Sequence, residues 1–409
     1  MNAGHRMLLA VVCGVAVASV YAAQPVLEPM GRDLGVPTEL TGWFVAAGQF
    51  GYLAGLLLLV PLGDVVDRRR LIAVQLAVTS VGMMLTALSS AAWQAFAGLA
   101  TAGVFAVVVQ IAVAYAASAS RPAERGRNIG VVTSGVVVGI LGARVASGAL
   151  ADMWGWRGVY AVLAVLSVGL AALVSAVLPP DPVTSPAKYR EAVCSLGRLL
   201  GQRTFLTRGL VAFFLFASFG TLWSGLSTPL AGGPWQLSET HIGLFGIAGL
   251  AGALGAARAG RWADAGRATP VSGLALAVLI LSWVAIAQLP WSLWLLIIGI
   301  VALDFAVQTV HVSNQHVLTA TYPDRLSGVI GGYMVFYSLG SALGAAATTA
   351  TFTTYGWTGS SLLGSGFAAC ALVVWLVVKA GSRSDTAGAV PLPVRRGRAP
   401  HSVVGTPEE

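Results

Sequence analysis

The sequence predicts an all-helical protein that crosses a membrane many times. Apolar stretches of about 20 residues follow one another along nearly the whole chain, and a helix of that length spans a hydrocarbon core of about 30 Å. Hydrophobic residues make up 56% of the 409 residues, charged residues only 10%, and the mean hydropathy is +0.79. In lipid, the backbone N–H and C=O groups need hydrogen-bond partners within the protein, which helices and closed barrels provide. The stretches lack the alternation of polar and apolar residues that barrel strands show, so helices are expected.

Twelve spans are expected, six in each half of the chain. The first six are 7–29, 41–62, 71–90, 93–118, 128–150 and 158–178. The last six are 209–230, 241–257, 270–289, 291–318, 326–350 and 358–379. The predicted parts are an N-terminal six-helix bundle (1–178), a cytoplasmic linker (179–208), a C-terminal six-helix bundle (209–379) and a disordered cytoplasmic tail (380–409).

The basic residues predict the orientation. With both termini in the cytoplasm, all but three of the 24 Lys and Arg residues fall in cytoplasmic segments, the exceptions being Arg32, Arg144 and Arg157. The net charge of +8 then reflects topology and not nucleic-acid binding, which needs one contiguous basic surface. A cleavable N-terminal signal is the alternative for the first span, but its removal would spoil this alternation. We expect a multi-pass, monomeric protein of the bacterial plasma (inner) membrane.

The two halves carry related sequence features. Pairs that recur at nearly one offset are Gly63 with Gly260, Asp67 with Asp264, and Gly155-Trp156 with Gly356-Trp357. Because each half has an even number of expected spans, both enter the membrane from the same side. The halves are therefore predicted to be parallel repeats.

The loop before the third span carries a family signature. Residues 63–70, Gly-Asp-Val-Val-Asp-Arg-Arg-Arg, match the pattern G-x-x-x-D-[RK]-x-[GR]. In this the chain resembles the major facilitator superfamily of transporters, and the resemblance covers roughly residues 7–379. It implies two six-helix bundles that tilt against each other about a central cavity.

This loop is expected to act as a conformational latch. Gly63 lets two helix ends approach, and Asp67 lies where the dipole of the third span favours a carboxylate. Arg68 and Arg70 are expected to pair with carboxylates of the opposite half. The counterparts in the second half are Gly260 and Asp264. An alternative remains open, in which the arginines only fix topology.

Small-residue stripes predict close helix packing. They are Gly51-x-x-x-Gly55, Gly135-x-x-x-Gly139, the series from Gly243 to Gly255, and Gly340-x-x-x-Gly344. In the superfamily these four helices line the seam between the halves, so the stripes are expected there.

The fifth span resembles an antiporter motif. The pattern G-x8-G-x3-G-P-x2-G-G runs from Gly130 to Gly148, with Arg144 in place of the proline. Together with residues 21–25 and 312–315, it is similar to the bacterial proton-coupled drug and arabinose efflux branch. The motif arginine that many drug exporters carry in the fourth span is missing from 99–103, so its coupling role cannot be carried over.

Two residues with charged side chains, Arg144 and Asp304, lie well inside expected spans. Each costs on the order of 3 kcal/mol if it faces lipid, so each is expected to face a cavity or a partner. Depth along the helices places them about 14 Å apart, which is too far for a salt bridge. Removal from water favours the neutral acid, so a carboxyl group that faces the two sides in turn can carry a proton.

The polar stripe on the tenth span predicts a wet pathway. Asp304 shares one helical face with Gln308, His311 and Gln315, and Asn314 lies beside it. We expect Asp304 to titrate, with His311 as a possible relay and Arg144 as a further coupling candidate. The alternative is that these side chains only hydrogen-bond between helices.

Candidate cavity residues are chosen from the helices that line the cavity in the superfamily. The candidates for substrate contact are Tyr21, Gln24, Gln110, Tyr115, Trp223, Gln308, Asn314, Gln315, Tyr333 and Tyr337. A cavity with several aromatic groups and few charges suits an apolar or weakly polar organic molecule.

Export of a small organic compound (drug, sugar or metabolite) in exchange for protons, by alternating access, is the expected function. Uptake by symport or facilitated diffusion is the alternative, and a non-transporting sensor is the third. No nucleotide-binding loop, metal-spaced His/Cys cluster or nucleophile-base motif is present, so no enzymatic activity, cofactor or metal is expected. The expected partners are the substrate, protons and the lipid bilayer.

Overall fold

The computed structural model describes residues 1–121, 124–181, 199–255, 268–322 and 326–387, and these contain helices and no strand. Eight described helices are long and apolar enough to cross a membrane. Two of them, α7 (Arg125–Val177) and α15 (Leu326–Ala387), bend at a kink, and each covers two expected spans. The shorter apolar helices α11 (Glu239–Gly255) and α13 (Ala268–Ile286) cover two more. The all-helical membrane fold is confirmed, and the count of twelve stays a prediction.

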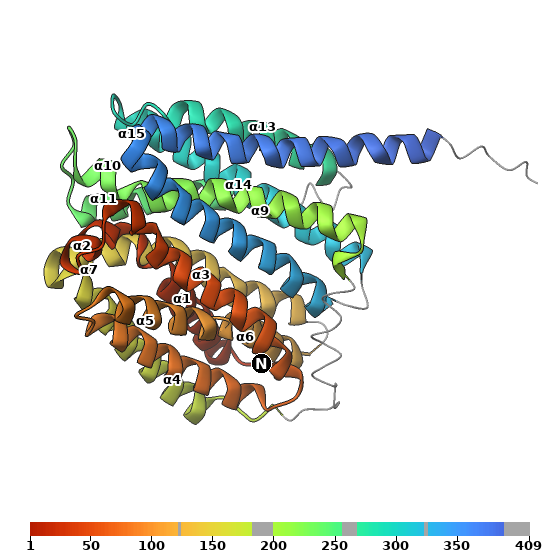
Figure 1. Ribbon diagram of the computed structural model, residues 1–409. Helices are drawn as coiled ribbons and strands as arrows, with labels where there is room; N and C mark the ends of the chain where they lie inside the picture. Colours follow the sequence, from red (N-terminus) through yellow and green to blue (C-terminus); the bar gives the residue numbers. More distant parts are fainter. Residues whose placement is uncertain (122–123, 182–198, 256–267, 323–325, 388–409) are drawn as a thin grey trace, which may run out of the picture.

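The helices form two groups along the chain, which we call the N-half and the C-half. The other N-half elements are α1 (Ala3–Tyr21), η1 (Gln24–Val26), α2 (Leu27–Asp33), η2 (Thr38–Leu40), α3 (Gly42–Leu58), η3 (Val60–Asp64), α4 (Arg68–Ala87), α5 (Ala92–Phe105) and α6 (Val108–Ser118). The other C-half elements are α9 (Arg203–Gly225), α10 (Ser227–Ala231) and α14 (Leu293–Thr321). In Figure 1 the red-to-yellow N-half lies below the green-to-blue C-half, and α2, α10 and α11 gather at one end.

Some helix ends differ from the expected spans. α9 begins at Arg203 instead of 209, and α15 continues to Ala387, into the segment expected to be a disordered tail. Hydropathy detects only the part of a helix that lies in lipid, whereas the helix itself can continue past the membrane. Most of the expected linker and the remainder of the tail lie outside the described residues.

The kinks in α7 and α15 occur at the repeated Gly-Trp pairs. Gly155 has φ of 70° and Gly356 has φ of 62°, the left-handed region that glycine adopts without a steric penalty. The next residue in each case is a tryptophan with a bonded indole. Trp156 donates to Asp33 Oδ2 at 3.1 Å, and Trp357 donates to the carbonyl of Ile286 at 2.9 Å. The internal repeat is thus visible in the backbone as well as in the sequence.

Alanine at either kink is expected to destabilise the protein. Gly155→Ala and Gly356→Ala should each cost about 1 kcal/mol, because a side chain disfavours positive φ. Thermal unfolding followed by tryptophan fluorescence in detergent measures this. Gly169→Ala in α7, where an added Cβ meets nothing within 4 Å, is the control and should not lower stability. Equal melting temperatures for all three variants would contradict the argument.

Three of the four glycine stripes pack helices within one half, whereas Gly243 of the α11 stripe lies against the backbone of Arg144 across the seam. An added Cβ at Gly51 would clash with the carbonyl of Ala100 in α5, and one at Gly340 with the carbonyl of Phe213 in α9. Gly135 of α7 likewise approaches α1. The expectation that these stripes line the seam is therefore wrong for α3, α7 and α15. Small residues permit close approach to any neighbouring helix, so the pattern alone does not identify the partner.

The seam between the halves is closed at the end that the basic residues predict to be extracellular, here called the outer end. Gly42 of α3 lies against the backbone of α15 at Ala345, and Gly148 of α7 against the start of α11. Thr349 Oγ1 donates to the carbonyl of Glu39 at 3.0 Å. Hydrogen bonds between the halves are confined to this end within the described part of the chain.

Asp152 forms the charged contact of the outer seam. Its carboxylate accepts hydrogen bonds from the backbone N–H groups of Glu239 and Thr240, at 3.2 and 3.0 Å, where the dipole of α11 also favours a negative charge. Burial raises the pKa of Asp152, but the bonds from Glu239, Thr240 and Ser238 outweigh it and hold the pKa below its usual range. The ionised carboxylate therefore stabilises the closed seam at neutral pH, and this contribution is lost only as pH falls through the lowered pKa.

Asp152→Asn is expected to open the outer end more often. Loss of the charge should weaken the closed seam by about 1 kcal/mol, which is about fivefold in population. A cysteine at Ser147, buried beside the seam, would report this as about fivefold faster labelling by a membrane-impermeant maleimide in a chain without native cysteines. Asp33→Asn is the control, because Asp33 pairs with Arg157 inside the N-half. Equal labelling rates in Asp152→Asn and its parent would argue against the contact.

Candidate transport site

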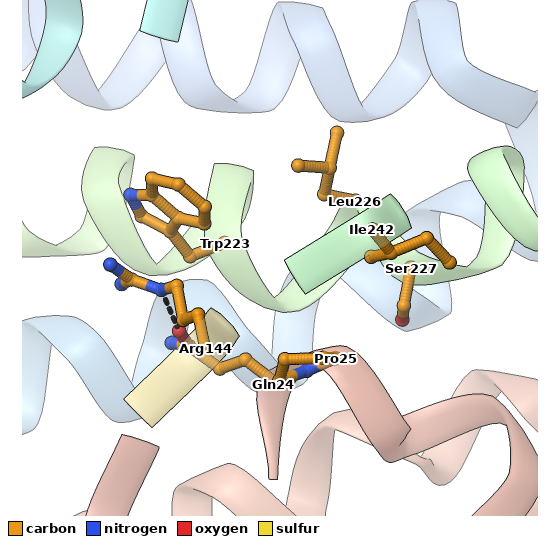
Figure 2. A pocket seen from close by; sticks show the side chains of 7 residues that line it. All are labelled: Gln24, Pro25, Arg144, Trp223, Leu226, Ser227 and Ile242. Carbon is orange, nitrogen blue, oxygen red and sulfur yellow. Dashed lines mark hydrogen bonds between the residues drawn. The ribbon is translucent and has the colours of Figure 1, made fainter. Parts of the chain in front are cut away.

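The site lies where the first and seventh expected spans are interrupted. α1 ends at Tyr21 and a 3-10 turn containing Pro25 follows, while α9 ends at Gly225 and α10 starts at Ser227. Proline cannot donate the helical hydrogen bond, and broken helices inside a membrane are tolerated where protein or a cavity surrounds them. Between the breaks lies a small pocket. Figure 2 shows its lining, which consists of Gln24, Pro25, Arg144, Trp223, Leu226, Ser227 and Ile242.

Arg144 reaches from the N-half into the C-half. Its guanidinium carbon lies 3.6 Å from the centre of the Trp223 ring, a cation–π contact, and its Nε–H donates to Gln24 Oε1 at 2.9 Å (Figure 2). The rings of Phe219 and Tyr21 lie within 6 Å of the same group, at 5.5 and 5.7 Å. Arg144 is only 1% exposed, yet Nη1 and Nη2 have no hydrogen-bond partner.

Asp304 of α14 lies close to the same indole. It is 1% exposed, its Oδ2 has no hydrogen-bond partner, and it interacts with both Arg144 and Trp223, although no salt bridge joins the two charges. The expected separation of about 14 Å was counted along helix axes. Side chains lean toward the N-terminus of their own helix, and these two helices run in opposite directions through the membrane. The two charged groups therefore lean toward each other.

A second polar cluster on α14 lies beyond Asp304. His311 Nδ1 is 3.0 Å from the hydroxyl of Tyr333, and Gln315 Nε2 is 3.2 Å from His311 Nε2. The His311 ring also packs near Tyr337. Gln308, His311 and Gln315 are partly exposed, whereas Asp304 is buried. The predicted stripe thus leads from a buried carboxyl group to more accessible polar side chains.

Other predicted cavity residues are placed elsewhere. Asn314 is buried and accepts from Arg208 at 3.1 Å. Gln110 donates to the hydroxyl of Tyr52 at 2.9 Å, and Tyr115 donates to the carbonyl of Pro179, after the last span of the N-half. Tyr115 therefore lies with the latch loop and not with Arg144. Among the described residues, no group of three His, Cys, Asp or Glu side chains could hold a metal ion.

The latch residues bind the start of the linker. Asp67 caps α4 by accepting from the N–H of Arg70 at 3.0 Å, and it also accepts from the N–H of Asp181 at 3.2 Å. Arg68 pairs with Asp181 at 2.9 Å. Asp181 is within reach because the chain after α7 turns back under this loop, and a partner of Arg68 in the opposite half stays a prediction. Gly63 packs against Ile111, and Gly260 and Asp264 lie outside the described residues.

Sequence reasoning missed part of the pocket lining. Pro25, Leu226, Ser227 and Ile242 were not nominated, although the prolines at 25 and 229 inside apolar stretches were a usable signal. Proline within an apolar span marks a helix break, and helix breaks at membrane depth often border a ligand site.

Buried opposite charges from two helical halves, beside a pocket at interrupted helices, are typical of membrane transporters. Residues 9–232 and 208–404 match the Major Facilitator Superfamily. The chain belongs to this family, whose members bind small-molecule substrates within a lipid membrane.

Proteins named as transporters are similar to this chain along most of their length. The putative uncharacterized transporter YgaY of Escherichia coli (strain K12) is 39% identical over 370 residues, covering 90% of this chain and 94% of YgaY. The probable transporter SCO4007 of Streptomyces coelicolor is 30% identical, covering 86% and 82%. Among solved structures, a bacterial homologue of the human lysosomal transporter Spinster aligns with a TM-score of 0.73 at 16% identity, covering 92% of this chain and 96% of that one. This last likeness shows the fold alone.

Proposed function

We propose that this transporter exports a small organic compound across the bacterial inner membrane in exchange for protons. The observation that carries the proposal is the meeting of Arg144 from the N-half and Asp304 from the C-half around Trp223. A substrate or proton bound there touches both halves, so its binding can favour one tilt of the halves over the other. Both termini lie in the cytoplasm, and one chain is sufficient for transport.

The proton and the substrate use Asp304 in turn. With the outer end open, Asp304 takes a proton from outside. With the inner end open, it releases the proton through the partly exposed stripe at Gln308, His311 and Gln315, and the substrate then binds to the ionised carboxylate. Arg144, held by Gln24 and Trp223, supplies the fixed counter-charge. Since the two ligands compete for one group, each must leave before the other binds, which is the condition for exchange.

Everted membrane vesicles with an acidic interior test this directly. Addition of a transported compound from a panel to the outer medium should collapse the pH gradient, because protons leave as the compound enters. A compound that moves only together with protons would instead establish uptake by symport. Binding of compounds without any flux would establish a sensor. Vesicles that lack the protein provide the baseline.

A further inference from the structure

The two charged groups of the site have unused bonding capacity of opposite kinds. On Arg144, the Nε–H is occupied by Gln24, while Nη1 and Nη2 are buried without partners. On Asp304, Oδ2 is buried without a partner. The Nε2 of Gln24 is also unpartnered. One side of the site thus offers hydrogen-bond donors with positive charge, and the other offers an acceptor with negative charge.

These unused atoms indicate the chemistry of a ligand. The Nη1/Nη2 edge of a guanidinium matches the two oxygens of a carboxylate, and the Trp223 ring and Gln24 fix the plane of that edge. A carboxylate such as Asp304 accepts from a cationic N–H group. Buried charges without partners are costly, so a bound ligand that completes both groups gains more than a ligand that completes only one.

We propose that the site between Arg144 and Asp304 binds a zwitterion of the α-amino-acid type. Its carboxylate binds the Nη1/Nη2 edge of Arg144, and its ammonium group binds Asp304. The remainder of the molecule lies against the apolar lining at Pro25, Leu226 and Ile242. This inference rests on the proposed function and names its substrate class. It also gives exchange a cause, because the ammonium group and a proton compete for the same carboxylate.

Other charge types fit the site less well. An anion without an ammonium group would complete Arg144 and leave Asp304 as a buried charge near a second anion. A cation without a carboxylate would complete Asp304 and leave Arg144 as a buried charge near a second cation. A neutral molecule would leave both charges without an ionic partner, and charge-assisted hydrogen bonds are roughly twice as strong as neutral ones.

Four leucine compounds that share one side chain and differ in charge test the inference. They are L-leucine, a zwitterion; N-acetyl-L-leucine, an anion; L-leucinamide, a cation; and N-acetyl-L-leucinamide, which is uncharged. Titration calorimetry on the purified full-length transporter gives the affinity of each. L-Leucine should bind at least about 10-fold more tightly than the other three, the effect of one charge-assisted contact. Glycine, L-threonine and L-phenylalanine extend the zwitterion series.

Variants separate the site from general stability. Arg144→Lys keeps the charge but loses the two-pronged edge, so L-leucine should bind about 10-fold more weakly. Gln75→Leu is the control, because Gln75 is a buried, unpartnered amide on α4, which packs against α5 and α7 of its own half. That variant should bind L-leucine as the parent does.

The inference is overturned if none of L-leucine, glycine, L-threonine and L-phenylalanine binds. It is also overturned if a leucine derivative that is not a zwitterion binds as tightly as L-leucine. Gradient collapse in proteoliposomes by N-acetyl-L-leucinamide, with no binding of amino acids, would leave proton exchange standing and remove the zwitterion. If L-leucine binds but moves no protons, the zwitterion site stands and proton exchange is removed. Protein-free liposomes correct for derivatives that cross the bilayer unaided.

Discussion

Asp304→Asn is expected to abolish proton-driven transport while the protein still inserts and folds. Asparagine has nearly the same shape but cannot take up or release a proton, so the exchange cycle has no carrier. Because the carboxyl group is buried beside Trp223 and its Oδ2 has no hydrogen-bond partner, the amide should fit without loss of a completed bond. We expect the proton flux evoked by substrate in everted vesicles to fall by about 100-fold or more.

The matched control for this variant is Asp33→Asn. Asp33 is exposed at the outer end, where it pairs with Arg157 and accepts from Trp156, so its loss removes a carboxylate without touching the transport site. Its flux should stay within about twofold of the parent, since exposed ion pairs contribute little. Undiminished pH-dependent transport by Asp304→Asn, at equal protein levels, would refute the role of Asp304.

Gly42→Leu is expected to hold the outer end open. A Cβ at this position would overlap the carbonyl of Ala345 and crowd the Thr349 hydroxyl, and both belong to the opposite half. The Ala345 carbonyl is backbone and cannot rotate away, so the halves must separate there. Overpacking of this kind typically costs about 1–3 kcal/mol, which the protein avoids by leaving the closed outer state. We expect net transport to slow.

The rate at which a buried outer-seam cysteine is labelled gives the readout for Gly42→Leu. A cysteine at Ser147 should react with an impermeant maleimide about 10-fold faster than in the parent, which corresponds to a shift of about 1.4 kcal/mol. Gly169→Leu adds the same side chain where nothing lies within 4 Å, and it should leave both transport and labelling unchanged. Slow labelling together with normal transport in Gly42→Leu would contradict the assignment of this end as the closed seam.

The fold was largely predictable because lipid makes strict demands on sequence. Spans must be apolar and about 20 residues long, and the repeated Gly-Trp pairs marked equivalent kinks at Gly155 and Gly356. The two central charges were predictable for the same reason, since Arg144 and Asp304 stand out in apolar spans.

The partners of individual residues were not predictable to the same degree. Counting depth along helix axes ignored the direction in which side chains lean, so the proximity of Arg144 and Asp304 was missed. Glycine spacing predicts that two helices approach closely, but not which two, and Gly51 packs within its own half. Arg68 pairs with Asp181, which follows the last span of the N-half in a segment without a periodic pattern.

The central claim is that the two halves tilt against each other about the site between Arg144 and Asp304, driven by the proton on Asp304. Spin-label distances in a chain without its three cysteines test it, using the exposed pairs Thr38 with Thr354 at the outer end and Arg70 with Thr204 at the inner end. Between high and low pH, the account predicts that one distance widens while the other narrows, and that Asp304→Asn removes this response. Distances that stay fixed, that change in the same direction, or that respond equally in Asp304→Asn would contradict it.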